Sequence, residues 1–252
     1  MDLRLRGKRA LVTGASRGIG RTIALSLAEF KVDVAINFFR NRGAAEDVAR
    51  EIEARGSRTL LVRGNVANEE HVSRMFDDIE AAWGGLDILV SNAASGVLKP
   101  VSELNLHHFH WTMDINAAAL LPLVQHLLHM PSEGPRSVIA VSSLGAVRAI
   151  PNYTAVGASK AALESMVRHL AAELGPRGVR VNAVSAGTVD TDALKHFPNR
   201  EQLLEESARR TPAGRLITPQ DVANVVVFLC TEYAAMIQGQ TLVVDGGYSI
   251  VA

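Results

Sequence analysis

The chain has 252 residues, of which 48% are hydrophobic, and 26 basic residues balance 26 acidic ones to a formal net charge of zero. This length suits one large α/β domain or two small ones, with enough apolar side chains for a sizeable core. The zero net charge argues against a nucleic-acid or anionic-membrane partner. The longest apolar run, Ala117–Val124, contains Pro122 and is too short to span a bilayer.

Cysteine content and the N-terminal residues bear on the cellular compartment. Cys230 is the only cysteine, so one chain can form neither a disulfide framework nor a cysteine-based metal site, and we expect no metal. Residues 1–9 are highly charged and lead directly into a strand pattern, which is unlike a signal peptide. These features predict a cytoplasmic protein in a reducing compartment.

Short β-rich runs alternate with helical patterns along the whole chain. The predicted strands are Arg9–Thr13, Asp33–Asn37, Thr59–Arg63, Asp87–Ser91, Ser137–Val141, Arg180–Ala183 and Thr241–Val244. The predicted helices lie near 18–29, 43–55, 69–83, 102–129, 155–174, 200–210 and 219–231. This alternation predicts a single Rossmann-type α/β domain over residues 1–252, with a doubly wound parallel sheet of about seven strands and helices on both faces.

A glycine-rich loop, Thr13-Gly14-Ala15-Ser16-Arg17-Gly18-Ile19-Gly20, follows the first predicted strand and opens the first helix. Small residues there let backbone amides and a helix N-terminus approach a pyrophosphate. Because the loop begins a strand–helix–strand unit, it predicts dinucleotide binding. The residues expected to contact the cofactor here are Gly14, Ser16, Arg17, Gly18, Ile19 and Gly20.

The second predicted strand ends in Ile36-Asn37-Phe38-Phe39-Arg40-Asn41-Arg42, which contains no acid. An acid usually binds a free ribose 2′-hydroxyl at this point, whereas a 2′-phosphate favours arginine. Arg17 and Arg40 therefore predict NADPH as the cofactor, because the planar guanidinium suits a phosphate. The alternative is that these arginines, and Arg42 above all, are ordinary solvated loop side chains.

An asparagine and a small or apolar residue follow each of the third and fourth predicted strands. Asn65 and Val66, and then Asn92 and Ala93, lie at the carboxyl ends of strands and are expected beside the adenine and its ribose. Asn116 lies within a predicted helix, where asparagine is not favoured. We expect it to hold backbone or water near the site, because a buried amide must be hydrogen-bonded. The alternative is a structural asparagine that bends the helix.

The stretch 142–160 joins a predicted buried strand to a helix and carries a serine pair, Tyr153 and Lys160. Seven residues of ideal helix make nearly two turns, so the tyrosine and lysine would share one face, roughly 10 Å apart in rise. An ammonium group lowers the pKa of a nearby phenol, and such a phenol can donate a proton to a developing oxyanion. Taken alone, the pair is more simply a tyrosine at a helix entry and a surface lysine.

Together these elements resemble the short-chain dehydrogenase/reductase superfamily over essentially the whole chain. Thr13–Gly20 resembles its cofactor loop, and Ser91–Ala94 its N-N-A-G element with Ala94 in place of the last glycine. Val244–Gly247 resembles its closing signature, and Asn182–Thr191 the segment that holds the nicotinamide carboxamide, with Ala186 in place of a proline.

The resemblance implies roles for individual residues. It implies that Gly187, Val189 and Thr191 contact the nicotinamide and that Lys160 binds the nicotinamide ribose. It also implies that Tyr153, Lys160, Ser143 and Asn116 are the catalytic residues.

The tyrosine departs from the usual Tyr-x₃-Lys spacing of the superfamily. Val156 occupies the usual tyrosine position and cannot donate, and the nearest tyrosine, Tyr153, gives Tyr-x₆-Lys. This spacing and the segment 144–153 resemble the enoyl-acyl-carrier-protein reductases. The segment 190–200 further resembles the NADPH-dependent type III enzyme among them. The resemblance implies reduction of the 2,3-double bond of an enoyl thioester carried on acyl carrier protein, by a homotetramer.

A chemical reason accompanies the changed spacing. In ketone reduction the hydride lands on the carbon that bears the oxygen, about 1.2 Å away. In enoyl reduction it lands on the β-carbon, and charge develops on an oxygen three bonds away. The proton donor must then lie roughly 2 Å or more further from the nicotinamide. The alternatives are a ketoacyl or other carbonyl reductase and a non-catalytic dinucleotide-binding protein, since a relic without its tyrosine would look similar at position 156.

The segment 190–215 is expected to cover the substrate, as lids do in enzymes of this kind. It carries four basic residues that suit an acidic carrier protein, although an ordinary solvated helix face explains them equally well. These residues are Lys195, Arg200, Arg209 and Arg210.

Overall fold

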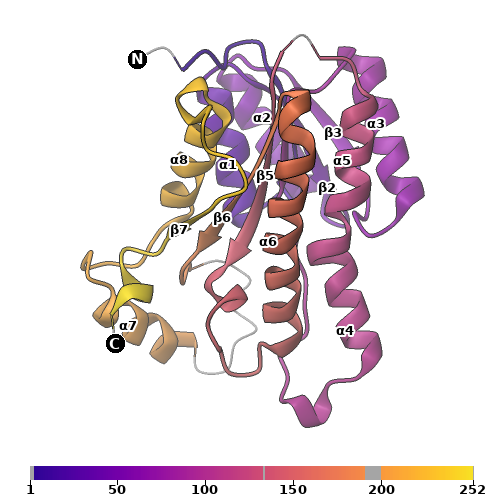
Figure 1. The fold of residues 1–252 in the computed structure, drawn as a ribbon. Coiled ribbons are helices and arrows are strands. Elements are labelled where there is room, and N and C mark those ends of the chain that lie inside the picture. The colour runs from indigo at the N-terminus through magenta and orange to yellow at the C-terminus, as the bar shows by residue number, and fades with distance from the viewer. Residues whose placement is uncertain (1–2, 133, 191–199, 252) are drawn as a thin grey trace.

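The computed structural model describes residues 3–132, 134–190 and 200–251 (Figure 1). Within these ranges, seven parallel strands form one sheet in the order β3-β2-β1-β4-β5-β6-β7. The strands are β1 (Arg9–Val12), β2 (Asp33–Phe38), β3 (Thr59–Arg63), β4 (Ile88–Ser91), β5 (Arg136–Ser143), β6 (Val179–Ala186) and β7 (Thr241–Val244). The predicted doubly wound Rossmann-type sheet is confirmed.

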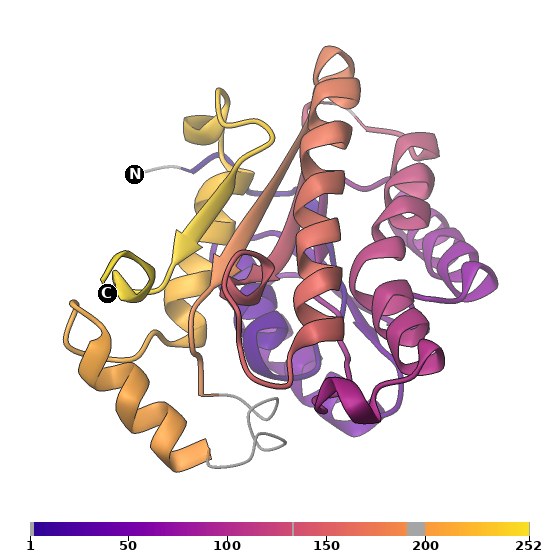
Figure 2. The ribbon, with the colours of Figure 1, turned by 60° about the horizontal axis from the view of Figure 1, so that its bottom comes forward.

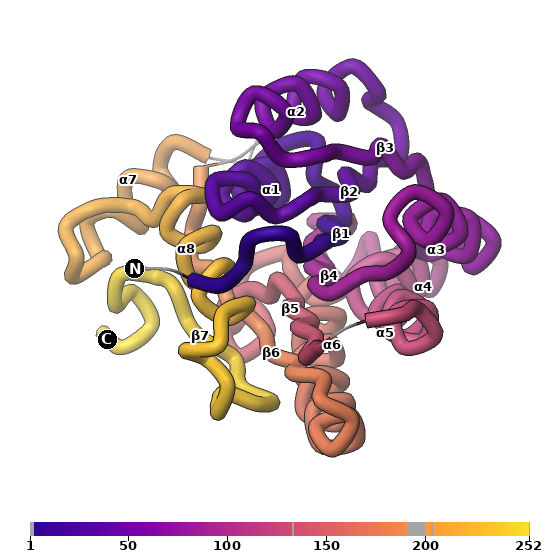
Figure 3. Tube along the Cα trace, turned by 90° about the horizontal axis from the view of Figure 1, so that it is seen from above, coloured from indigo at the N-terminus to yellow at the C-terminus, as the bar shows by residue number. Residues whose placement is uncertain are grey.

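Helices cover both faces of this sheet, as Figures 1 and 3 show. One face carries α1 (Gly18–Glu29), α2 (Arg42–Ala54) and α8 (Pro219–Cys230). The other carries α3 (Glu69–Trp83), α5 (Leu120–His129) and α6 (Thr154–Leu174), with α4 (Leu106–Met113) before α5. The remaining described helix, α7 (Arg200–Arg210), stands apart from the sheet, beside the C-terminal segment (Figure 2).

Alternate residues of the same strand enter two different hydrophobic clusters. In β1, Ala10 and Val12 pack toward α1, α2 and α8, whereas Leu11 packs toward α3, α5 and α6. Because helices cover both faces, the strands are nearly continuous apolar runs, and this made them recognisable in the sequence. Each large apolar side chain buried in this way contributes about 1.5–3 kcal/mol before the cost of ordering the chain.

The single helix expected over 102–129 is wrong. The structure divides it into a 3₁₀ turn at Val101–Glu103, then α4, a π-helical turn at Asp114–Ala118, and α5. The N–H of Ala119 donates to the carbonyl of Asp114 at 2.9 Å, which is the wide i to i+5 bond of a π-turn. Asn116 lies within this turn, so the helix breaks at a residue already singled out in the sequence.

Candidate active site

One threonine hydroxyl joins two loops at the point where the strand order reverses, between β1 and β4. Thr13 Oγ1 accepts the N–H groups of Asn92 and Ala93 at 2.9 Å each and donates to the Val90 carbonyl at 3.3 Å. Asn92 Nδ2 donates in turn to the carbonyl of Thr13 at 2.9 Å. Ligands of open α/β sheets bind at such a reversal, beyond the carboxyl ends of the strands.

Asn37, at the buried end of β2, fixes the glycine loop from its other side. Its Oδ1 accepts the Gly14 N–H at 3.1 Å, and its Nδ2 donates to the carbonyls of Val62 and Gly64 at 3.2 and 3.1 Å. This asparagine was not predicted as a site residue. The signal in the sequence was an amide within an otherwise apolar strand.

The N-terminus of α1 is available to an anion. Its N-cap residue is Arg17, and no side chain of the described residues caps the first turn. Asparagines cap α2, α3 and α4 instead, at Asn41, Asn68 and Asn105. Because the first amides of a helix need acceptors and carry partial positive charge, the pyrophosphate of a dinucleotide fits this end.

Two glycines allow the close approach that such a ligand needs. Gly14 has φ +64°, in the left-handed region that favours glycine. A Cβ at Gly20 would lie 2.4 Å from Asn92 Nδ2 and 2.5 Å from the Gly14 carbonyl oxygen. A side chain at position 20 would therefore push apart the loops after β1 and β4.

The other expected cofactor residues lie in loops after neighbouring strands. Ser16, Gly18 and Ile19 belong to the loop and start of α1, and Arg17 precedes that helix. After β3, Val66 is buried and Asn65 Oδ1 accepts the Ala67 N–H at 3.2 Å.

The loop after β6 reaches the same edge of the sheet. The Gly187 N–H donates to the Val244 carbonyl at 2.9 Å, and Val189 pairs with Ile217. Thr191 lies outside the described residues, so its expected role stays a prediction.

The three arginines near the expected 2′-phosphate differ in their surroundings. Arg17 and Arg40 are exposed, and within the described ranges neither forms an ion pair. The Arg40 guanidinium lies 5.5 Å from the centroid of the Phe39 ring. Arg42 instead forms an ion pair with Glu46 at 2.8 Å, one turn later in α2. This agrees with the alternative that Arg42 is an ordinary solvated side chain.

Three consecutive residues at the end of β5 hold three side chains of the following segment. The Val141 carbonyl accepts a hydrogen bond from Lys160 Nζ at 2.8 Å. Ser142 Oγ donates to Glu164 Oε1 at 2.6 Å, and Ser143 Oγ accepts the Tyr153 hydroxyl at 3.4 Å. The structure thus brings together the serine, tyrosine and lysine expected from the sequence.

The spacing suggested that Tyr153 and Lys160 share one face of a helix. The structure differs, because Tyr153 precedes the helix that carries Lys160. Tyr153 is the N-cap residue of α6, and its carbonyl accepts the Gly157 N–H at 2.6 Å. Its ring packs so closely on Gly145 that a Cβ there would lie 2.4 Å from Cε1. The preceding residue, Asn152, has φ +60°, so a local turn sets the direction of the ring.

The expected lowering of the Tyr153 pKa is also wrong. Burial raises the pKa of Tyr153, and the hydrogen bond with Ser143 only partly opposes this. Burial also lowers the pKa of Lys160 to about 8, against the charge of Glu164, which raises it. At neutral pH the phenol therefore carries its proton and the lysine is mostly charged.

Asn116 connects the active-site helix to the loop after β4. Its Oδ1 accepts the Ser95 N–H at 2.8 Å, and its Nδ2 donates to Ser159 Oγ at 3.0 Å. The prediction that it holds backbone near the site is confirmed. The helix-bending alternative applies as well, because the same residue lies in the π-turn.

Position 156, the usual tyrosine position, is packed with apolar atoms. The Val156 side chain is 7% exposed, and a Cβ at Gly96 would lie 2.3 Å from its Cγ2. In this chain the position therefore carries a buried apolar side chain with no hydroxyl to donate.

Within the described ranges, no group of three or more His, Cys, Asp or Glu side chains is placed to bind a metal ion. None of the helices described combines the length and the apolar character needed to cross a membrane.

Comparison with known proteins places these features among dinucleotide-dependent enzymes. A family model described as enoyl-(acyl carrier protein) reductase matches residues 14–249. The 1-cyclohexenylcarbonyl-CoA reductase of Streptomyces collinus is 41% identical over 245 residues, which cover 96% of this chain and 87% of that protein.

Solved structures agree over almost the whole chain. A short-chain dehydrogenase from Burkholderia cenocepacia J2315 in complex with NADP is 34% identical, with a TM-score of 0.90 and coverage of 98% and 99% of the two chains. A 7α-hydroxysteroid dehydrogenase in complex with NADH and 7-oxo glycochenodeoxycholic acid is also 34% identical, with a TM-score of 0.92 and coverage of 98% and 96%.

Gly20→Ala is expected to weaken dinucleotide binding, because the new Cβ would displace Asn92 and the Gly14 carbonyl. We expect a loss of about tenfold or more, which corresponds to about 1.4 kcal/mol. Fluorescence titration with NADPH measures this. Gly43→Ala in α2 is the matched control, since its Cβ would meet only Asn41 Oδ1 at 3.9 Å. Equal affinity of the Gly20→Ala variant and the unaltered protein would refute the role given to this glycine.

Proposed function

Because the chain belongs to the short-chain dehydrogenase/reductase superfamily and is an oxidoreductase of that superfamily, we propose that it reduces the 2,3-double bond of enoyl thioesters with NADPH. The observation that carries the proposal is the position of the phenol. Tyr153 reaches the site from the N-cap of α6, whereas the usual position is closed by Val156. The relative from Streptomyces collinus supports it, because 1-cyclohexenylcarbonyl-CoA is by name an unsaturated thioester.

The cofactor would be held by backbone and side chains described above. The loop from Gly14 to Gly20 and the uncapped start of α1 suit the pyrophosphate, and Arg17 and Arg40 suit the 2′-phosphate. Lys160 would bind the nicotinamide ribose hydroxyls. When bound, NADPH supplies the hydride that goes to the β-carbon of the substrate.

Tyr153 stabilises the negative charge that develops on the thioester oxygen. Since its pKa is raised by burial, the phenol is protonated at neutral pH and can donate to the enolate oxygen. The charged Lys160 is held at the same strand end by the Val141 carbonyl. Ser143 Oγ, which accepts both the Tyr153 hydroxyl and the Gly145 N–H, orients the phenol. The α-carbon then takes its proton from Tyr153 or from water.

The carrier of the acyl group is proposed to be acyl carrier protein. Two of the basic residues considered for that contact are already paired, Arg200 with Asp190 at 2.5 Å and Arg209 with Glu206 at 2.7 Å. Arg210 lies 5.3 Å from the Tyr248 ring centroid, and Lys195 lies outside the described residues. Coenzyme A is the alternative carrier, named for the Streptomyces relative. We place the reaction in the cytoplasm and in fatty acid or related biosynthesis.

A carbonyl reductase is the second candidate. The 3.4 Å between the Tyr153 hydroxyl and Ser143 Oγ lets both groups contact one carbonyl oxygen, as ketone reduction requires. The name of the 7α-hydroxysteroid dehydrogenase also points to alcohol or ketone chemistry in a relative. A non-catalytic dinucleotide-binding protein is less well supported, because tyrosine, lysine and serine meet at one strand end. Oxidation of NADPH with crotonyl thioester, with acetoacetyl thioester, or with neither separates the three.

Tyr153→Phe removes only the hydroxyl and is expected to lower turnover of crotonyl thioester by roughly 10²–10⁴-fold, the range for a lost acid–base group. NADPH affinity should barely change, because the ribose contacts come from Lys160. Tyr233→Phe is the matched control, since that residue is 56% exposed and the variant keeps the aromatic ring in the groove beside α8.

Two further variants sharpen this test. Adding Val156→Tyr to Tyr153→Phe should not restore enoyl reduction, because the hydroxyl would then lie too near the nicotinamide. Lys160→Ala should impair both binding and turnover. If Tyr153→Phe turns over crotonyl thioester as fast as the unaltered protein, the proposed mechanism is wrong.

Arg40→Ala is expected to raise the KM for NADPH selectively and to leave the KM for NADH unchanged. A charge-assisted contact is worth about 1.5–3 kcal/mol, so the increase should be about tenfold or more. Arg42→Ala is the control, because that guanidinium is paired with Glu46. Equal use of both cofactors by the unaltered protein would contradict the NADPH preference.

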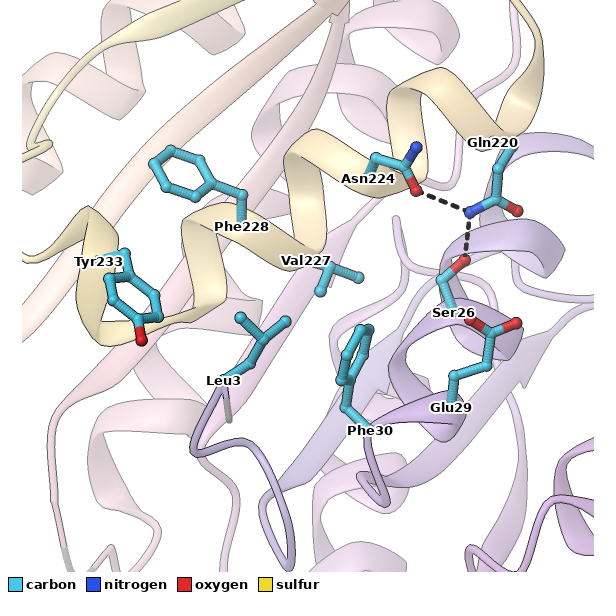
Figure 4. A pocket seen from close by; sticks show the side chains of 9 residues that line it. All are labelled: Leu3, Ser26, Glu29, Phe30, Gln220, Asn224, Val227, Phe228 and Tyr233. Carbon is cyan, nitrogen blue, oxygen red and sulfur yellow. Dashed lines mark hydrogen bonds between the residues drawn. The ribbon is translucent and has the colours of Figure 1, made fainter. Parts of the chain in front are cut away.

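We also propose that the enzyme is a homotetramer with two-fold interfaces. Two separate apolar grooves support this. One, of about 490 Å³, lies between α1 and α8 and is lined by Leu3, Phe30, Val227, Phe228 and Tyr233, with a polar end where Gln220 donates to Ser26 and Asn224 (Figure 4). The other, of about 440 Å³, lies between α5 and α6 at Leu121, Met166 and Leu170. Light scattering at micromolar concentration should give four times the chain mass, and a monomer would refute the proposal.

A further inference from the structure

Glu164 is a buried carboxylate to which the proposed reaction assigns no step. It is 7% exposed and lies one helical turn after Lys160 on the buried face of α6. The other buried residues of this face are Ala155, Val156, Ser159, Lys160, Leu163, Val167, Ala171 and Leu174. A buried carboxylate is unfavourable unless hydrogen bonds and an opposite charge compensate it, so an apolar residue would be the simpler choice here.

The contacts of Glu164 place it in the catalytic arrangement. Ser142 Oγ donates to its Oε1 at 2.6 Å, from the strand residue between Val141 and Ser143. Those two neighbours hold Lys160 and Tyr153. The carboxylate is therefore fixed by the same strand end that fixes the two groups of the reaction.

Lys160 needs a negative charge close by. Lys160 is 6% exposed, and the Val141 carbonyl gives its ammonium an acceptor but no charge. The charged or titratable side chains carried by the elements around it are Tyr153 before α6, Arg136 on β5, Arg180 on β6, Asp114 on the π-turn, Arg177 after α6, and His107, His108 and His110 on α4.

Most of these groups are poorly placed to compensate the ammonium. The arginines are cations and cannot compensate an ammonium, and Arg136 and Arg180 also lie at the opposite edge of the sheet, near the starts of β5 and β6. Asp114 is exposed. Tyr153 is protonated because burial raises its pKa. Glu164 instead lies one turn along the same buried face of α6, where its negative charge raises the pKa of Lys160.

We propose that Glu164 is a positioning residue that keeps Lys160 protonated, and thereby able to bind the nicotinamide ribose and support Tyr153. The inference rests on the proposed function, because it gives Lys160 its role in the reduction. Glu164 itself acts through Lys160, because it is buried and its hydrogen bond goes to Ser142.

The direction of the effect follows from the two opposing causes. Burial lowers the pKa of Lys160 to about 8, and the negative charge of Glu164 raises it. Without that charge, burial acts unopposed, so the lysine loses its proton at a lower pH. The fraction of charged Lys160 near neutral pH would then fall.

Lysine NMR titration tests this without any turnover. The chain contains five lysines, so labelling lysine with ¹³C at Cε gives five signals, and Lys160→Arg identifies the one to follow. Between about pH 6 and 10, the unaltered protein should titrate at that signal near 8. In Glu164→Gln the midpoint should fall by about one pH unit or more, the size of shift that a nearby opposite charge produces.

Matched variants separate this effect from general damage. Glu173→Gln removes the same charge from an exposed position of α6 and should leave the midpoint unchanged. Glu164→Met replaces the carboxylate with an apolar group of similar volume and should shift the midpoint as Glu164→Gln does, even if the glutamine variant folds poorly. Glu164→Asp, which keeps the charge, should restore most of the original midpoint.

Kinetics give a second reading that a merely structural residue would not move. The alkaline limb of kcat/KM for crotonyl thioester should shift to lower pH in Glu164→Gln and stay in place in Glu173→Gln. If the protein does not reduce crotonyl thioester, the proposed function fails while the NMR titration still decides the role of Glu164. A Lys160 midpoint that is the same in Glu164→Gln, Glu164→Met and the unaltered protein would overturn the inference.

Discussion

The end of β5 is the constraint on which the active site depends. Val141, Ser142 and Ser143 are consecutive, and each forms a hydrogen bond with a different side chain from the segment that follows. β5 lies inside the sheet between β4 and β6, so parallel ladders on both sides fix its register. A slip of one residue would turn each side chain to the opposite face and separate all three groups at once.

The cofactor side of the site is built on a different principle. There backbone groups form most of the expected binding surface, through the uncapped start of α1 and the glycines that let a ligand approach. Thr13 and Asn37 hold that backbone by side-chain hydrogen bonds to neighbouring loops. Asn116 links the two sides, because it binds both the loop after β4 and Ser159 on α6.

The sequence predicted those features that depend on neighbouring residues in the chain. β3 and β7 have the predicted bounds, because short apolar runs between turns mark strands covered on both faces. The glycine loop was recognisable from its place between a strand and a helix. The π-turn, the N-cap position of Tyr153 and its raised pKa were not, since they depend on packing between distant segments. Asn37 and Glu164 escaped notice because burial, which no single position in the sequence reveals, gives them their importance.

The packing of Val156 against Gly96 couples the residue types that these two positions can hold. A side chain at position 96 would occupy the space of the valine methyl, so the two positions cannot change independently. The valine methyl lies against the loop after β4, so a bulkier side chain at position 156 would press on that loop, which joins the catalytic side to the cofactor loop. The effects of substitutions at positions 96 and 156 on stability should therefore not add, because both side chains would compete for the same space.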